Sequence, residues 1–136
     1  MKILEKFRSE RGQGMVEFAL CLPLLLSILC GILDFGWIYY NKYNVDHAAF
    51  EASRYGSVHY EEGMSSADIN TLKSEMITTA KNVDNTVTVS PGDIVLTADS
   101  VKVTVKKDIP TLTFVASTVW GRNYHAKATC ETAIND

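Results

Sequence analysis

The chain has 136 residues, of which 46% are hydrophobic, and a net charge of −3. It is long enough for one modest domain and an appendage. Residues 1–12 hold four basic and two acidic side chains, so the remainder carries −5, which argues against nucleic acid as a partner. Of three cysteines, only Cys130 lies beyond the apolar N-terminal region, so we expect no disulfide framework, metal or other cofactor.

A long apolar segment follows the basic N-terminal arm and predicts one membrane-spanning helix. Residues 18–33 contain no charge and would form a helix of roughly 24 Å, whereas residues 15–40 would reach roughly 39 Å and cross a hydrocarbon core of ~30 Å. Asp34 falls near the far end, where we expect it to be interfacial and solvated. Aromatic residues typical of a membrane interface follow it: Phe35, Trp37, Tyr39, Tyr40 and Tyr43.

The charge distribution around this segment predicts its direction. Basic residues lie on the N-terminal side, so we expect the N-terminus in the cytoplasm and the C-terminal part outside. A cleaved secretory signal peptide is the competing interpretation. The apolar run is longer than a usual signal core, however, and no clear small-x-small cleavage site precedes polar sequence.

The apolar segment continues into an amphipathic one, which predicts a single helix of about 40 residues over positions 15–55. Pro23 removes a backbone donor and predicts a kink in its first half. Gly56 is the candidate C-terminal cap. One face of the second half carries residues with helical spacing: Val45, Ala48, Ala49 and Ala52.

The remaining sequence predicts a second helix and then strands. Residues 57–66 are typical of a loop, Ser66 is the expected cap, and residues 67–82 have helical periodicity. Residues 111–120 are compatible with either a strand or a short buried helix, bounded by Pro110 and Gly121. An alternating pattern predicts antiparallel strands at residues 86–90, 94–98, 101–107 and 124–134. The fold class is therefore α+β, with the amphipathic half of the first helix lying across the sheet.

Several of these segments together resemble the N-terminal signature of TadE-like proteins, the pseudopilins of tight-adherence (Flp) pilus systems. The resemblance is strong over about residues 11–56 and weaker over the later strand, the Pro-Thr-Leu segment and the final strand. Its pieces occur in this order: Arg11-Gly12, Val16-Glu17-Phe18-Ala19, Leu22-Pro23-Leu24-Leu25, Gly31-Ile32-Leu33-Asp34-Phe35-Gly36 and Glu51-Ala52-Ser53-Arg54-Tyr55-Gly56.

The resemblance implies a pilin-like fold and a prepilin-type leader. A prepilin peptidase would cleave after Gly12, making Gln13 residue +1 and Glu17 residue +5, and the Glu17 carboxylate would pair with the N-terminal amine of a neighbouring subunit. Gln13 departs from the hydrophobic +1 residue of type IV pilins, so N-methylation is not implied. Gly14 is a second candidate cleavage position, but it would place Glu17 at +3. Without the resemblance, Glu17 reads as an interfacial carboxylate that favours the helix N-terminus.

The resulting expectation is a minor pilin or pseudopilin of a Tad/Flp pilus, involved in surface attachment. Its parts are a cytoplasmic leader (1–12), a transmembrane helix (13–40) and an extracytoplasmic pilin-like domain (41–136). The partners implied are the prepilin peptidase, other pilin and pseudopilin subunits, the membrane assembly platform and the lipid bilayer. The protein would reside in the cell membrane and, after assembly, in the extracellular pilus.

Two alternatives belong to other classes of protein. An uncleaved, single-pass membrane-anchored binding domain fits the same apolar helix. An extracellular enzyme finds no support in any arrangement of catalytic residues, and we expect no enzymatic activity.

Overall fold

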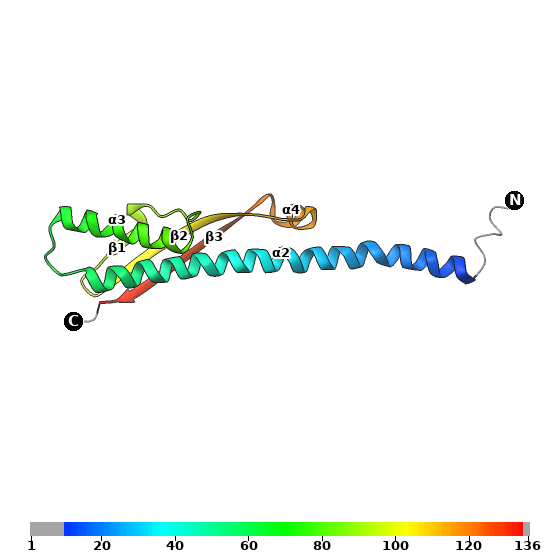
Figure 1. The fold of residues 1–136 in the computed structure, drawn as a ribbon, viewed down its shortest axis with the longest axis horizontal. Coiled ribbons are helices and arrows are strands. Elements are labelled where there is room, and N and C mark those ends of the chain that lie inside the picture. Colours follow the sequence, from blue (N-terminus) through cyan, green and yellow to red (C-terminus); the bar gives the residue numbers. More distant parts are fainter. Residues whose placement is uncertain (1–9, 135–136) are drawn as a thin grey trace.

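The structure, a computed structural model, describes residues 10–134. One helix, α2 (Glu10–His59), extends along the whole molecule, and all other elements gather beside its C-terminal half (Figure 1). In chain order these elements are α3 (Ser66–Val83), the 3-10 turn η1 (Pro91–Asp93), β1 (Ile94–Leu96), β2 (Ser100–Pro110), α4 (Phe114–Trp120) and β3 (Asn123–Ala133). We call residues 34–134 the packed body, and residues 13–29, which are all exposed, the uncovered segment.

The α+β fold class expected from the sequence is confirmed. The strands form an antiparallel sheet in the order β1-β2-β3, and α2 packs on one face of it while α3 lies along α2. The register pairs Val103 with Ile94 on one side and with Cys130 on the other. The opposite sheet face carries charged and polar side chains, as the alternating pattern requires.

The core lies between α2, α3 and the sheet, and small residues let these layers approach closely. Alanines line the buried face of α2, and valines line the facing side of β2. Fully buried members include Val45, Ala48, Ala52, Met76, Ala80, Val101, Val103, Val105 and Ile109. The amphipathic second half of the predicted long helix is thereby confirmed.

Gly56 is not the end of α2, and the prediction that it caps the helix is wrong. The helix continues to His59, and the Gly56 carbonyl accepts a hydrogen bond from the Tyr60 amide at 2.9 Å. A Cβ at Gly56 would lie 2.6 Å from Met76 Cε and 2.9 Å from Val101 Cγ1. A glycine stands here because α3 and β2 both approach the α2 backbone closely.

Two local predictions also differ from the structure. The helix α3 begins one residue earlier than expected, and Ser65, rather than Ser66, accepts a hydrogen bond from the Asp68 amide at 3.3 Å. The strand expected at residues 86–90 is reduced to one bridge, Thr88 to Lys106. The ladder stops where Ser90 and Asp93 bond to each other around η1, which turns the chain into β1.

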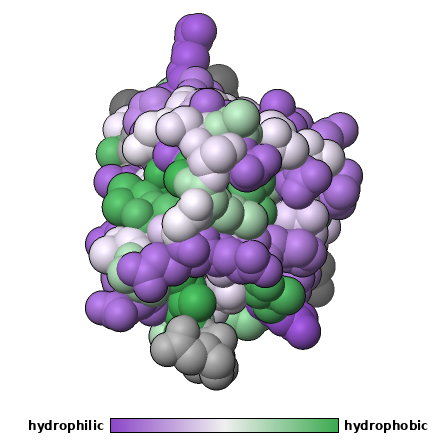
Figure 2. Space-filling view, turned by 90° about the vertical axis from the view of Figure 1, so that its left-hand side faces the viewer, coloured by the Kyte–Doolittle hydropathy of each residue, from purple (hydrophilic) through white to green (hydrophobic). Residues whose placement is uncertain are grey.

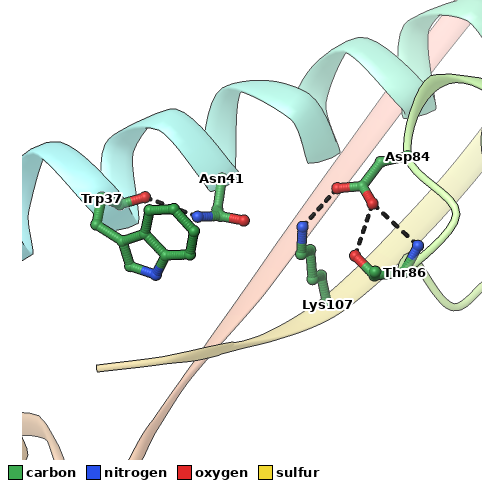
Figure 3. A network of polar contacts seen from close by, with 5 residues as sticks. All are labelled: Trp37, Asn41, Asp84, Thr86 and Lys107. Carbon is green, nitrogen blue, oxygen red and sulfur yellow. Dashed lines mark hydrogen bonds and ion pairs between the residues drawn. The ribbon is translucent and has the colours of Figure 1, made fainter. Parts of the chain in front are cut away.

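The segment between α3 and η1 is tied to β2 by charge-assisted hydrogen bonds (Figure 3). The Lys107 ammonium lies 2.5 Å from an Asp84 carboxylate oxygen, and each of these side chains is only 10% exposed. The Thr86 amide and hydroxyl donate to the other oxygen of Asp84. Burial raises the pKa of Asp84, but the hydrogen bonds from Lys107 and Thr86 outweigh burial and bring that pKa below its ordinary value.

The lowered pKa predicts a pH dependence for the packed body. Ionised Asp84 stabilises the folded state at neutral pH, and this contribution disappears as the pH falls through the pKa of folded Asp84. We expect Asp84→Asn to lower the free energy of unfolding by about 1–3 kcal/mol at pH 7 and to make its decline below about pH 5 shallower. Urea unfolding of the full chain in detergent, monitored by near-ultraviolet circular dichroism at several pH values, measures the free energy of unfolding and its pH dependence.

Asp46→Asn is the matched control, because the Asp46 side chain is 52% exposed and, among residues 10–134, pairs with Lys42 alone along the helix surface. It should change the free energy of unfolding at pH 7 by less than about 0.5 kcal/mol. Equal losses at positions 46 and 84 would contradict the role assigned to Asp84.

Candidate assembly site

The residues implicated in processing lie in the first turn of α2. Gly12 and Gln13 follow the helix start at Glu10, and the Gln13 and Gly14 positions are exposed. Residues 1–9 of the expected leader lie outside the described residues.

Glu17 lies one turn further along, on the exposed surface of α2. Among residues 10–134 no described hydrogen bond or ion pair involves its carboxylate. The structure therefore does not bring Gly12, Gln13 or Glu17 together with the packed body, and any partner of the Glu17 carboxylate has to come from outside the described chain. Its proposed pairing role stays a prediction.

Pro23 lies inside α2, and the helix continues through it. The Ser27 hydroxyl donates to the Pro23 carbonyl at 2.8 Å, a bond within the same helical turn. The kink expected at Pro23 stays a prediction.

The uncovered segment presents apolar side chains all around the helix. Figure 1 shows the N-terminal half of α2, which includes this segment, lying apart from every other labelled element. In the described part of the chain, α2 is the single helix long and apolar enough to cross a membrane. The exposed apolar residues of this segment include Met15, Val16, Phe18, Leu20, Leu22, Leu24, Leu25, Leu26, Ile28 and Leu29.

Asp34 marks the point where the packed body begins to cover α2. It is fully buried, and one carboxylate oxygen accepts the amides of Leu112 and Thr113 at 2.9 and 3.0 Å. The Thr113 hydroxyl donates to the other oxygen. The expectation that Asp34 is solvated is therefore wrong: its carboxylate fixes the turn that starts α4, where Thr113 is the N-terminal cap.

One turn later, Trp37 makes a second connection to the same region. Its indole Nε1 donates to the Pro110 carbonyl at 3.1 Å. The Trp37 carbonyl accepts a hydrogen bond from Asn41 Nδ2 at 2.9 Å (Figure 3). Pro110 ends β2 and pairs in register with Asn123, which begins β3. Asp34 and Trp37 thus hold the tip of the β2–β3 connection, including α4, against α2.

The comparison with protein families now bears on the same residues. The family model described as TadE-like protein matches residues 12–54. The chain carries a TadE-like segment. Comparisons with curated proteins and with solved structures found no match.

The matched range confirms the resemblance and coincides with most of α2. It contains Gly12, Glu17 and Asp34, whereas Thr113 and α4 lie outside it. The matched segment is similar to TadE-like proteins, and α2 has the length and composition of a helix that could cross a membrane once.

The contact between Asp34 and Thr113 was not predicted from the sequence. The two residues are 79 positions apart, and no periodicity links them. The available signal was indirect: both lie in pieces that resemble TadE-like proteins, the Gly-Ile-Leu-Asp-Phe-Gly run and the Pro-Thr-Leu segment. The open choice for residues 111–120 is resolved in favour of a short helix, α4, ended by Gly121 at φ 82°, but this helix is mostly exposed rather than buried.

We expect Asp34→Ala to loosen α4 from α2. The change leaves the amides of Leu112 and Thr113 without their acceptor, at a cost of about 1–3 kcal/mol. Hydrogen exchange of the full chain in detergent should show faster exchange at these two amides, with β2 centre amides unchanged. Asp34→Asn keeps one acceptor oxygen and should have a smaller effect. Unaltered exchange at positions 112 and 113 in Asp34→Ala would contradict the anchoring role.

Proposed function

We propose that this protein is a minor pilin or pseudopilin, a structural or assembly subunit of a Tad/Flp pilus. The observation that carries the proposal is the coincidence of the TadE-like match with α2. The same helix supplies the core of the packed body with its C-terminal half, whereas residues 13–29 are exposed and no other element among residues 10–134 covers them. A subunit that is held first by lipid and then by neighbouring helices needs such a surface.

Processing by a prepilin peptidase would convert α2 into the assembly-competent form. Cleavage between Gly12 and Gln13 removes the basic arm and creates a new amine at the start of the helix. The Gln13 side of this bond lies on the exposed surface of α2, so the packed body does not cover it. After cleavage the Glu17 carboxylate lies four residues, about one helical turn, from the amine-bearing residue of its own chain.

The pairing of Glu17 with a neighbour's amine would set the axial register of the subunits. A charged carboxylate beside hydrocarbon is costly, and an amine on an adjacent helix offsets much of that cost. The apolar remainder of the uncovered segment packs almost equally well at several axial positions, because it has no other charge up to residue 33. One ion pair therefore selects one position among these alternatives.

In this proposal the packed body lies outside the cytoplasmic membrane and becomes part of, or helps to build, the pilus used for surface attachment. The prepilin peptidase, other pilin subunits and the assembly platform of the membrane are its partners. The protein acts by association and catalyses no reaction.

The mature N-terminus tests the proposal directly. Intact-mass measurement and N-terminal sequencing of the protein from its own cells should give a chain that begins at Gln13. Gly12→Leu should abolish cleavage, whereas Gly14→Leu should leave Gln13 as the first residue. A functional protein that retains residues 1–12 would contradict the proposal and favour the uncleaved membrane-anchored binding domain.

A further inference from the structure

We infer that α4 and the turn before it contact the outer leaflet of the lipid bilayer, so that the packed body is seated on the membrane as well as anchored by α2. This inference rests on the membrane insertion of α2 contained in the proposed function. It concerns a different part of the chain, outside the TadE-like match.

The position of α4 along α2 is the first argument. Asp34 and Trp37 fix the turn before α4 to α2, and α4 is the element of the packed body nearest to the uncovered segment (Figure 1). Asp34 lies 17 residues after Glu17, roughly 26 Å along a helix. With Glu17 near one interface of a hydrocarbon core of ~30 Å, α4 lies at the other interface.

The composition and exposure of this region are the second argument. Residues 109–121 contain no charged side chain. Leu112, Phe114 and Val119 are 58%, 85% and 67% exposed. A short helix in water usually turns its large apolar side chains inward, whereas here they point away from the protein. This arrangement is typical of a segment that inserts apolar side chains into a membrane interface.

Continuity with the apolar surface of α2 identifies the occupant as lipid. Ile32, Leu33 and Phe35 next to Asp34 are exposed, so the apolar surface of α2 continues along the helix to the level at which α4 packs on it. The end of the packed body opposite the N-terminus is different, since hydrophilic residues dominate it and separate its apolar patches (Figure 2). Apolar exposure is therefore concentrated on the membrane side.

The burial of Asp34 fits the same location. An ionised carboxylate next to lipid is costly unless donors surround it. The Asp34 carboxylate is closed off by two amides and one hydroxyl of the turn before α4. A second protein copy that covered α4 would also have to lie within the membrane interface, so lipid is the occupant available to a single inserted chain.

Spin-label accessibility of the full chain in vesicles of phosphatidylethanolamine and phosphatidylglycerol tests the inference. The natural cysteines (Cys21, Cys30 and Cys130) are replaced by alanine, and one nitroxide is attached through Val119→Cys, Leu29→Cys or Val58→Cys. Frequent collisions of the nitroxide with dissolved oxygen show that the label lies in lipid. Frequent collisions with a water-soluble nickel complex, present on both sides of the membrane, show that it lies in water. Val58 is the matched control, because it is an exposed valine at the far end of α2.

We expect oxygen collisions to dominate at positions 119 and 29 and nickel collisions to dominate at position 58. Nickel dominance at 119 with oxygen dominance at 29 would overturn the lipid contact of α4 and leave the membrane anchor intact. Nickel dominance at 29 would overturn the anchor and, with it, this inference. Spin–spin broadening at 119 that disappears on dilution with unlabelled protein would show that a second copy covers α4, and would overturn the assignment to lipid.

A charge substitution provides an independent readout. Phe114→Glu places a carboxylate on a side chain that is 85% exposed, so the packed body should still fold. With the label at position 119, this variant should shift collisions from oxygen towards nickel, whereas Val58→Glu should leave them unchanged. An unchanged ratio in Phe114→Glu would overturn the inference.

Discussion

Glu17→Gln is expected to abolish incorporation of the protein into pili while leaving its membrane insertion and its cleavage intact. The carboxamide has nearly the same size as the carboxylate but carries no charge, so it cannot form the ion pair proposed with a neighbour's N-terminal amine. Removing one partner of a buried ion pair costs about 3–5 kcal/mol, which corresponds to a fall in incorporation of more than about a hundredfold. Immunoblots of sheared surface fractions and of membrane fractions measure the two pools.

The control for this experiment is Glu62→Gln, which makes the same chemical change in the exposed loop between α2 and α3. It should leave the surface fraction unchanged. Normal incorporation of Glu17→Gln, in a protein whose N-terminus is confirmed as Gln13, would contradict the register role without contradicting processing. A helix-favouring interfacial carboxylate would then be the better description of Glu17.

Gly56→Val is expected to destabilise the packed body severely. The new side chain would meet Met76 Cε and Val101 Cγ1 within 3 Å of its Cβ, and Met76 and Val101 are both fully buried. The Met76 side chain is flexible, but the Val101 methyl is held by a β-strand and cannot retreat easily. Overpacking of this kind costs typically about 1–3 kcal/mol, and the free energy of unfolding by urea should fall by at least that amount.

Gly36→Val separates this packing effect from the effect of valine on a helix. Gly36 also lies inside α2, but no neighbouring atom lies within 4 Å of the position of its Cβ. Valine has a higher helix propensity than glycine, so the control should be neutral or slightly stabilising. Equal losses of stability in both variants would show that close packing at Gly56 is not the cause.

The elements that sequence periodicity predicted correctly are those whose signal is local. The α2 and α3 helices and the strands β2 and β3 repeat their buried residues at fixed intervals, so the buried face is visible in the sequence. The predictions that failed at Gly56 and Asp34 depended on residues that are distant in the sequence. Glycine is common at helix ends, and only the approach of Met76 and Val101 shows that Gly56 is a packing residue inside the helix.

The candidate site also has a part that the sequence predicts and a part that it does not. The positions of Gly12, Gln13 and Glu17 at the start of an exposed apolar helix follow from the sequence, but their proposed partners are other molecules, so the fold of one chain does not test their roles. Asp34 was visible in the sequence as a carboxylate at the end of the apolar segment. Its burial depends on Thr113, which follows β2 in the chain and lies beside Asp34 because β2 runs back along α2.

The continuity of α2 has a mechanical consequence. No loop interrupts the helix between Glu17 and the packed body, so the two are fixed in rotational phase as well as in height. At about 100° per residue, the 17 steps from Glu17 to Asp34 place these side chains about 100° apart around the axis. The direction from which a neighbour binds Glu17 therefore fixes the rotation of the whole packed body about the axis of α2. Inserting one residue between Glu17 and Asp34 would change that rotation by about 100°.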